Sequence, residues 1–262
     1  MLVSGSSDTF VKRNPKAHRD FFAAEAAGLH WLGEAGAPVV RVLEYGPTHI
    51  ELERLTAANP TLSAAAGFGR ALARMHDGGA AGFGAPPVDS DGAPFSGQLF
   101  IGARPMSNTV HRTWGAFYAA ERVLPFLRIA VDAGTVTSAE AATVESACRR
   151  IADGVFGDAE PPSRIHGDLW SGNVFWTDTG VVLIDPAAHG GHRETDLAML
   201  ALFGCPLLDE IIEEYESVRP LRDGWRERVS LHQLHPLAVH AAGHGRSYGV
   251  ALHTAAAAVE RL

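Results

Sequence analysis

The segment His166-Gly167-Asp168-Leu169-Trp170-Ser171-Gly172-Asn173 decides both the fold and the chemistry expected of this chain. Asp168 and Asn173 stand five positions apart, in the order His-x-Asp-x-x-x-x-Asn that is typical of a kinase catalytic loop. Gly167 and Gly172 allow the backbone to turn back sharply, so that both polar side chains can point into one space. A lone Asp or Asn in a Gly-rich loop would more often cap a turn, but the complete spacing favours a chemical role.

A second acidic residue, Asp185, follows the short apolar run 181–184, which predicts a strand. The tetrapeptide 177–180, Thr-Asp-Thr-Gly, precedes that run and predicts a hairpin turn. Phosphoryl transfer needs a group that orients the attacking hydroxyl and accepts its proton, and oxygen ligands for Mg²⁺. We expect Asp168 to be this base, ionised at neutral pH if its pKa is near the usual value of about 4. Asn173 and Asp185 are the expected Mg²⁺ ligands, because this ion prefers hard oxygen donors.

Two charged residues near the start of the chain are candidates for holding the nucleotide. Lys12 ends a predicted strand at 9–12, and Glu25 lies early in a predicted helix at 21–33. A strand lysine paired with a helix glutamate holds the α- and β-phosphates of ATP in kinase-type sites. Either residue alone would be interpreted as a solvated surface charge. With Asp168 and Asp185 downstream, we expect the two to form such a pair.

The order of predicted elements indicates two unequal parts. Strand, helix, strand and strand patterns occupy 9–12, 21–33, 39–45 and 49–55, and a Gly/Pro-rich loop is expected at 78–97. Helical patterns dominate the rest, at 62–76, 111–133, 139–152, 195–203, 207–217 and from 225 to the end, interrupted by a β element at 164–185. We expect the 111–133 helix to bend or break near Pro125. The predicted class is α+β, with a small sheet lobe over residues 1–57 and a larger, mostly helical lobe over residues 58–262.

Composition excludes several function classes. The 262 residues are 46% hydrophobic and 20% charged, which is typical of a folded protein. A formal charge of −8 without a Lys/Arg block argues against nucleic acid as a partner, and no apolar run is long enough for a membrane span or a signal peptide. Two distant cysteines, Cys148 and Cys205, favour a reducing cytoplasm. No closed zinc spacing is formed by the clustered histidines His232, His235, His240 and His244.

Several runs together resemble one family, the fructosamine kinases (ketosamine-3-kinases), relatives of the aminoglycoside phosphotransferases and choline kinases. They are the 166–173 segment, Phe10-Val11-Lys12, Glu25-Ala26-Ala27-Gly28-Leu29, Phe100-Ile101-Gly102, Ile184-Asp185-Pro186-Ala187 and Gly191-His192-Arg193-Glu194-Thr195-Asp196-Leu197-Ala198-Met199. The resemblance implies a bilobal protein-kinase-like fold with ATP and Mg²⁺ as cofactors. It also implies phosphorylation of the 3-hydroxyl of a ketosamine, a sugar attached to a small amine or to a protein lysine. The product sheds its sugar, so the family is associated with deglycation.

The resemblance also implies further site residues. The hinge that binds adenine through backbone groups is expected at Glu53 to Leu55. Trp170 either lies under the sugar ring or is a core aromatic residue. Asp196 is expected to cap a helix that starts at Leu197 and to order the catalytic loop. Other substrate contacts are expected at His192, Arg193 and Glu194.

The start of the chain departs from the family pattern. Family members begin with two strands joined by a Gly-rich turn that covers the ATP phosphates, whereas eleven residues precede Lys12 here. The turn at Ser4-Gly5-Ser6-Ser7-Asp8 resembles the next turn along. The sheet lobe is therefore expected to be truncated: either the true start lies upstream, or the chain binds nucleotide with an open phosphate site. Two alternatives stay beside a ketosamine kinase: a kinase for an aminoglycoside-like or choline-like amine, and an inactive member that binds ligand.

Overall fold

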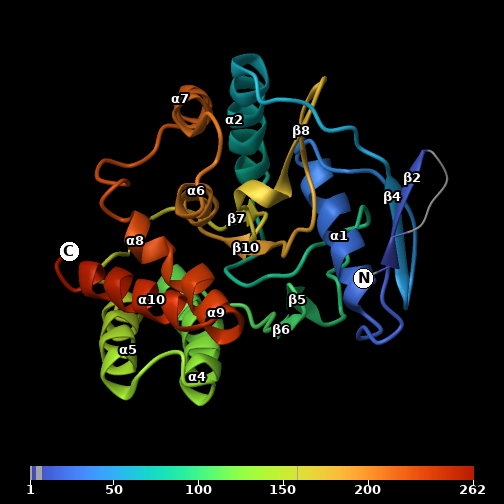
Figure 1. The fold of residues 1–262 in the computed structure, drawn as a ribbon. Coiled ribbons are helices and arrows are strands. Elements are labelled where there is room, and N and C mark those ends of the chain that lie inside the picture. Colours follow the sequence, from blue (N-terminus) through green and yellow to red (C-terminus); the bar gives the residue numbers. More distant parts are fainter. Residues whose placement is uncertain (1, 4–7, 158) are drawn as a thin grey trace.

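The computed structural model describes residues 2–3, 8–157 and 159–262, arranged as a small sheet region beside a larger helical part (Figure 1). The sheet has the strand order β1-β2-β4-β3, from β1 (Leu2–Val3), β2 (Thr9–Arg13), β3 (Val42–Gly46) and β4 (His49–Glu53). Helix α1 (Phe21–Glu34) covers one face of it. Phe22, Ala26 and Leu29 of α1 form one buried cluster with Ile50 and Leu52 of β4. This hydrophobic contact fixes the helix, and with it Glu25, against the strands.

The pairing of β1 with β2 places a strand ahead of the one that carries Lys12, with Leu2 opposite Arg13 and Val3 opposite Lys12. The predicted turn at residues 4–8 lies largely outside the described residues. On the other side, β2 pairs antiparallel with β4, and Lys12 faces Ile50. Lys12 therefore lies on an inner strand of the sheet, and it is buried.

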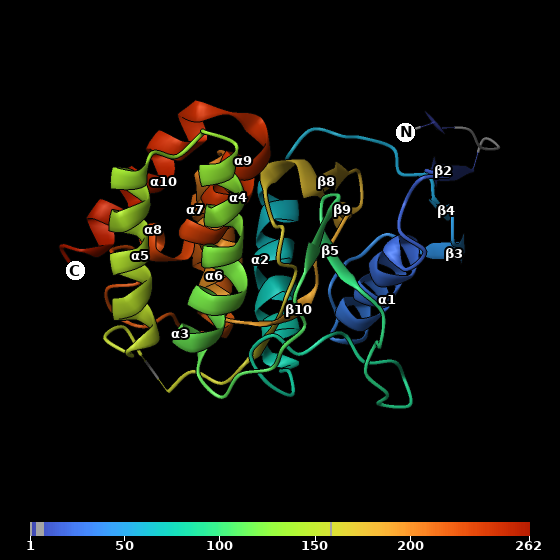
Figure 2. The same ribbon diagram turned by 90° about the horizontal axis from the view of Figure 1, so that it is seen from below.

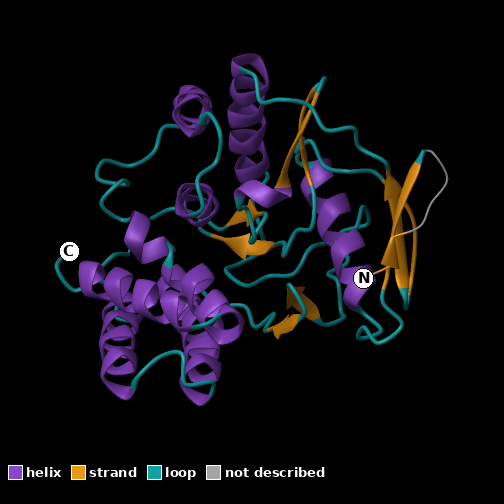
Figure 3. Cartoon of the chain, in the orientation of Figure 1, coloured by secondary structure: helices purple, strands orange, loops and turns teal. Residues whose placement is uncertain are grey.

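Helices build the remainder of the chain, and Figure 3 shows them gathered away from the sheet. Their bounds are α2 (Leu62–Asp77), α3 (Trp114–Phe117), α4 (Leu124–Asp132), α5 (Ser138–Ala152), α6 (Arg193–Leu202), α7 (Leu208–Val218), α8 (Val229–His232), α9 (Leu234–His244) and α10 (Arg246–Val259). Figure 2 shows α4, α5, α9 and α10 packed together at the end remote from the sheet. Their side chains belong to one large buried cluster. Among the described residues, no helix has the length and apolar character needed to cross a bilayer.

Three short antiparallel pairs complete the fold: β5 (Leu99–Ile101) with β6 (Arg104–Met106), β7 (Ser163–Ile165) with β10 (His189–Gly191), and β8 (Val174–Thr177) with β9 (Gly180–Leu183). The predicted turn at 177–180 is confirmed, since Thr177 pairs with Gly180 across β8 and β9. The β9 strand also joins the two parts of the molecule, because Val40 N–H donates to Leu183 O over 3.0 Å.

Most predicted elements are present, and the α+β class is confirmed. The stretch 111–133, expected to bend or break near Pro125, is divided into α3, a π-helical turn η1 (Tyr118–Val123) and α4, so the regular helix is interrupted just before Pro125. Pro125 stands at the start of α4 and has no backbone N–H to donate. The wider π-helical turn before it accommodates this missing hydrogen bond, and the regular helix then resumes. The proposed boundary between lobes falls in the segment 54–61, which joins β4 to α2 without regular structure. The division into two domains stays a prediction.

Candidate active site

Residues from both parts of the molecule line one cavity of about 310 Å³. Six predicted site residues meet there: Lys12, Glu25, Asp168, Trp170, Asn173 and Asp185. They come from β2, from α1, from the loop after β7 and from the residues that follow β9. Five of the six are charged or amide side chains, so the cavity can accept a polar ligand.

Lys12 lies at the centre of a charged group. Its Nζ donates to Glu25 Oε1 over 2.7 Å and also forms an ion pair with Asp185. The side chains of Lys12 and Glu25 are 8% and 10% exposed, whereas that of Asp185 is 46% exposed. The buried carboxylate thus fixes the ammonium, while Asp185 keeps one side toward the cavity. The expected pairing of Lys12 with Glu25 is present in the geometry.

The catalytic loop brings Asp168 and Asn173 together. Asn173 Nδ2 donates to the Asp168 carbonyl over 2.8 Å and lies 3.4 Å from Asp168 Oδ2. Burial raises the pKa of Asp168 to about 7, although the bond from Asn173 lowers it and Asp196 raises it further. The expectation of an ordinary carboxyl pKa is therefore wrong, because the loop removes Asp168 from water. A base with a pKa near neutrality accepts a proton efficiently at that pH.

A buried carboxylate, Asp196, holds the backbone of this loop. Its two oxygens accept N–H bonds from His166 over 2.7 Å and from Gly167 over 3.0 Å. His76 Nε2 donates to it as well, over 3.2 Å. The expected role of Asp196 in ordering the loop has this geometric support. Helix α6 begins at Arg193 with His192 as its N-cap, so the expectation that Asp196 caps a helix starting at Leu197 is wrong.

His166 connects the catalytic loop to the strand that leads to Asp185. Its Nε2 donates to Ile184 O over 3.0 Å, which leaves Nδ1 to accept the Asp168 N–H over 3.3 Å. Burial lowers the pKa of His166, so the neutral ring is the favoured form. Ile184 N–H also donates to Asn173 O over 3.2 Å. The backbones that carry the expected base and the expected metal ligands are thus joined directly.

Asp185 has a left-handed backbone with φ of 54°, which is unusual for a residue with a side chain. Such a conformation costs of order 1 kcal/mol and persists where the surrounding structure requires it. The turn lets the chain leave β9 with the Asp185 carboxylate directed at Lys12. Ala187 N–H then donates to His166 O over 2.9 Å and closes the loop.

Trp170 lines the cavity two residues after Asp168 and is 41% exposed. The edge of its ring approaches Gly172, where an added Cβ would lie 2.3 Å from the indole. Glycine at that position is therefore what admits the ring. On its other side Trp170 meets Phe203 edge to face, with 6.2 Å between ring centroids. Of the two expected roles, the partly exposed position favours contact with a ligand.

The expected adenine hinge does not line this cavity. Glu53 Oε1 accepts the backbone N–H of Arg41 over 2.9 Å, and Leu55 packs at the edge of the cluster between α1 and the sheet. A role of these residues for adenine through their backbone groups stays a prediction.

The structure places His192, Arg193 and Glu194 away from the cavity, each no more than 3% exposed. Arg193 forms a two-bond ion pair with Glu160. Both oxygens of Glu194 accept from Arg228, over 3.0 and 2.6 Å. These side chains build the base of α6, so the expectation that they contact substrate lacks geometric support.

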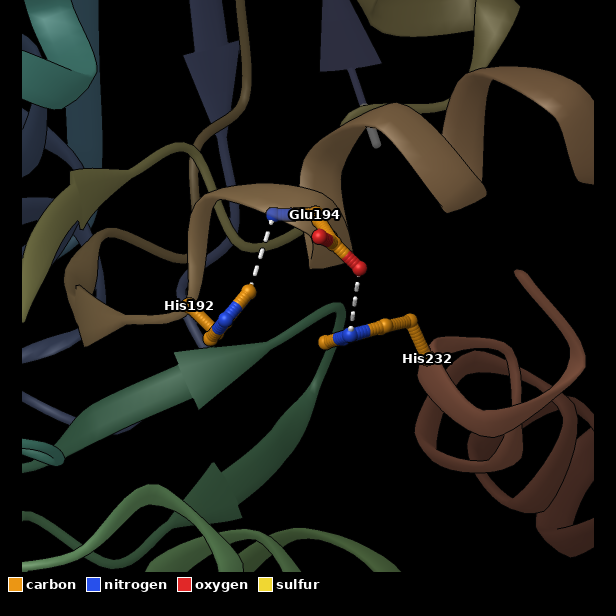
Figure 4. Close-up of side chains that lie close together, drawn as sticks. All are labelled: His192, Glu194 and His232. Carbon is orange, nitrogen blue, oxygen red and sulfur yellow. Dashed lines mark hydrogen bonds and ion pairs between the residues drawn. The ribbon is translucent and has the colours of Figure 1, made fainter. Parts of the chain in front are cut away.

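His192, Glu194 and His232 lie close enough to suggest a metal site (Figure 4). Glu194 Oε2 lies 3.4 Å from His232 Nε2, and His192 Nδ1 accepts the Glu194 N–H over 3.2 Å. The guanidinium of Arg228 already neutralises the Glu194 carboxylate. A cation bound there would be repelled by Arg228, so the cluster is better explained as a buried ion pair beside two imidazole rings.

One wall of the cavity comes from the β5–β6 hairpin, through Leu99, Phe100 and Gly102. Phe100 packs edge to face on Phe21 of α1, with 5.3 Å between ring centroids. Sequence reasoning missed this wall, because three-residue strands give too short a pattern. The only signal was the Phe100-Ile101-Gly102 run itself.

The residues present fit Mg²⁺ by the chemistry of their donors. Asn173 and Asp185 line the same cavity and offer an amide oxygen and a carboxylate. Because Asn173 Nδ2 donates to Asp168, the Oδ1 atom is the end of the amide that can accept a cation. Hard oxygen ligands of this kind suit Mg²⁺, which usually takes few ligands from protein.

Comparison with known proteins agrees with this site. The model of the family "Fructosamine kinase" matches residues 1–261. A "Probable ketoamine kinase" of Vibrio parahaemolyticus is 31% identical over 254 residues, covering 95% of this chain and 83% of its own length. The crystal structure of a "putative fructosamine-3-kinase" from Thermobifida fusca YX-ER1 superposes with a TM-score of 0.89 at 47% identity, covering 97% of this chain and 86% of that one.

More distant structures share the fold alone. The gentamicin–APH(2")-IIa complex superposes with a TM-score of 0.61 at 11% identity, covering 98% of this chain and 86% of that one. The protein-kinase-like fold, the hydrogen bonds that join the 166–173 loop to the strand leading to Asp185, and the family match over residues 1–261 therefore agree. The chain is a small-molecule kinase that belongs to the fructosamine kinase family.

Proposed function

We propose that this protein transfers the γ-phosphoryl group of ATP to the 3-hydroxyl of a ketosamine, a fructosamine or ribulosamine on a free amine or a protein lysine. The cavity supports this because the residues proposed as base, phosphate contact and metal ligands, namely Asp168, Lys12, Asn173 and Asp185, line it together with the partly exposed Trp170. The family name and the ketoamine kinases among its relatives point to the same substrate class.

Asp168 is the proposed catalytic base. As the substrate hydroxyl oxygen forms its bond to the γ-phosphorus, the bond from that phosphorus to the ADP oxygen breaks and the hydroxyl proton passes to Asp168. A pKa of about 7 leaves much of Asp168 ionised at neutral pH. The hydrogen bonds from Asn173 hold the carboxylate in the loop. Positioning of this kind supplies much of the rate in phosphoryl transfer.

Lys12 is the proposed contact to the α- and β-phosphates. Its ammonium is fixed by Glu25, so little freedom is lost when a phosphate binds. Asn173 and Asp185 would hold Mg²⁺, which supplies neutralisation of the phosphate charge when it is bound. The present ion pair between Lys12 and Asp185 shows that the two groups reach the same place.

The single observation that carries the proposal is the convergence of Lys12, Asp168, Asn173 and Asp185 on one cavity. The test measures ADP release and product mass with fructoselysine, ribuloselysine, an aminoglycoside and choline. We expect turnover with a ketosamine and a gain of one phosphoryl group in its mass. Turnover with the aminoglycoside or choline alone would transfer the assignment to another amine kinase. Folded protein that is inert with all four, and is not stabilised by ATP with Mg²⁺, would instead indicate an inactive member.

A deglycation role in the cytoplasm is part of the same proposal. Cys148 and Cys205 are free, buried thiols whose pKa values are raised by burial, as expected where no disulfide is required. Loss of the sugar from a phosphorylated glycated peptide, followed by mass spectrometry, tests the repair role directly.

A further inference from the structure

The most unusual buried charge outside the cavity is Arg122. Its side chain is 1% exposed, and it lies in the π-helical turn η1. Among the described residues, no carboxylate forms an ion pair with its guanidinium, and its Nη2 has no hydrogen-bond partner. Burial of an unpaired charge is costly.

Of the three hydrogen bonds that the Arg122 side chain donates, one goes to the neighbouring Glu121 carbonyl over 3.2 Å and the other two run toward the cavity. Its Nε donates to His189 Nε2 over 3.3 Å, and its Nη1 donates to Ser107 O over 3.0 Å, just after the β6 strand. The guanidinium also lies over the Phe117 ring, 4.6 Å from its centroid. Arg122 therefore joins the end of the hairpin that walls the cavity to the strand that follows the Asp185 loop.

His189 passes this contact on to the Asp185 loop. Its Nδ1 donates to Ala187 O over 2.8 Å, because a carbonyl can only accept. A neutral ring protonated on Nδ1 has a lone pair on Nε2, and that lone pair accepts from Arg122. The guanidinium cannot accept, so it also disfavours the other tautomer and the doubly protonated ring. Arg122 thereby keeps His189 in the form that binds Ala187.

The imidazole fills a corner between the two loops of the site. A Cβ added to Gly167 would lie 2.3 Å from Ala187 O and 3.1 Å from the His189 ring. Ala187 N–H meanwhile donates to His166 O over 2.9 Å. Ala187 thus packs against Gly167, the residue before Asp168, and lies two residues from Asp185 in the sequence. A shift of the His189 ring would therefore move both the Asp168 loop and the Asp185 loop.

The π-helical turn itself is held from the other side. His235 Nδ1 donates to the Arg122 carbonyl over 2.8 Å, and His235 N–H donates to Tyr118 Oη over 3.0 Å. Both histidine and tyrosine are buried. The wider turn therefore has a fixed partner in α9, which sets where the Arg122 side chain begins.

We propose that Arg122 is a positioning residue of the phosphoryl-transfer site, which orients His189 so that the Asp185 loop stays in register with Asp168. This rests on the proposed function for the roles of Asp168 and Asp185. Under this proposal η1 controls the distance between the base Asp168 and the metal ligand Asp185, although η1 contributes no residue to the cavity.

The test compares Arg122→Met with Arg122→Lys and with a matched control, Arg150→Met. Arg150 likewise donates to a backbone carbonyl, Val259 O at 2.8 Å, and lies over a ring, Phe156 at 5.1 Å, but has no route to the cavity. Three quantities are measured: amide hydrogen exchange of residues 185–190 in nucleotide-free protein, Mn²⁺ affinity with a non-hydrolysable ATP analogue, and kcat. Far-UV circular dichroism and the melting temperature report the fold.

We expect Arg122→Met to speed exchange at Ala187 and to lower kcat and Mn²⁺ affinity by about 10- to 100-fold, the usual effect of losing a group that orients a ligand. Arg122→Lys should recover part of each, since an ammonium can still donate to His189. Arg150→Met should change stability alone. Equal effects of Arg122→Met and Arg150→Met on exchange and kcat would overturn the proposal.

Should Arg122→Met not fold, His189→Asn and His189→Leu decide the matter. Asparagine can keep a donor near the Nδ1 position for Ala187 O, whereas leucine cannot. The proposal therefore requires slower amide exchange and faster turnover in His189→Asn than in His189→Leu. Equal values in the two variants would overturn it. Exchange is read without nucleotide or substrate, so its result stands apart from the proposed function, which fails only if wild-type protein phosphorylates no ketosamine.

Discussion

Replacement of Asp168 by asparagine is expected to stabilise the protein while abolishing its activity. The pKa of about 7 in the folded chain, against an ordinary value of 3.8, corresponds to about 4 kcal/mol, since one pKa unit is worth about 1.4 kcal/mol. That figure is the upper limit of the destabilisation caused by ionised Asp168. Because the side chain keeps some exposure to water, we expect about half of it, about 2 kcal/mol.

The dependence on pH gives the sign of this effect. The folded-state pKa of Asp168 is raised, so below about pH 4 the carboxyl is protonated in both states and the variant gains nothing. Between about pH 4 and pH 7 the unfolded chain ionises first, and wild-type stability falls relative to the variant. Well above pH 7 the difference in unfolding free energy between the variant and the wild type reaches its full value and stays constant.

The assay is the melting temperature of nucleotide-free wild type and Asp168→Asn from pH 4.5 to 8.5, with chelator present. A gain of about 2 kcal/mol corresponds to roughly 4–8 °C for a chain of this size. Asp178→Asn, at an exposed turn between β8 and β9, is the matched control and should show no such divergence. The reasoning would be refuted if Asp168→Asn melted at the wild-type temperature at pH 8. It would also be refuted if the gain in melting temperature were the same at pH 4.5 and pH 8, because burial of ionised Asp168 could then not be its cause.

Three further outcomes follow from the site. Lys12→Met should raise the KM for ATP more than the KM for the ketosamine, because Lys12 is the proposed contact to the phosphates; an unchanged KM for ATP in steady-state assays would contradict this role. Trp170→Ala should raise the KM for the ketosamine with little effect on ATP, and an increase of less than about threefold would remove Trp170 from the substrate contacts. Asp196→Asn should destabilise the fold by about 1–3 kcal/mol, because an amide group would face the donors of His166 and Gly167; urea unfolding measures this, and unchanged stability would argue against it.

The catalytic half of the site was predictable because its chemistry is local in sequence. Asp168 and Asn173 are brought together by the short loop that carries them. Asp185 is delivered by a strand that hairpins directly onto that loop. Lys12 and Glu25 are farther apart along the chain, but the strand-then-helix order predicts that they face each other.

The features that the sequence did not predict depend on contacts between residues far apart in the chain, which sequence spacing does not reveal. In the sequence Glu194 is a polar residue shortly after Asp185, the expected metal ligand, yet in the fold it pairs with Arg228, which follows much later in the chain, after α7. The π-helical turn at Arg122 likewise follows from packing against His235 in α9. The raised pKa of Asp168 is of the same kind, because burial comes from the assembled fold.

The position of the new phosphate on the product tests the central claim most directly. Fructoselysine is incubated with the protein, ATP and Mg²⁺, and the product is examined by ¹H–³¹P correlation NMR, with Asp168→Asn as the catalytic control. We predict a phosphorus coupling to the proton on carbon 3 of the sugar with wild type, and no phosphorylated sugar with the variant. Phosphate on another hydroxyl, or equal product from the variant, would contradict the assignment of this cavity as a ketosamine 3-kinase site.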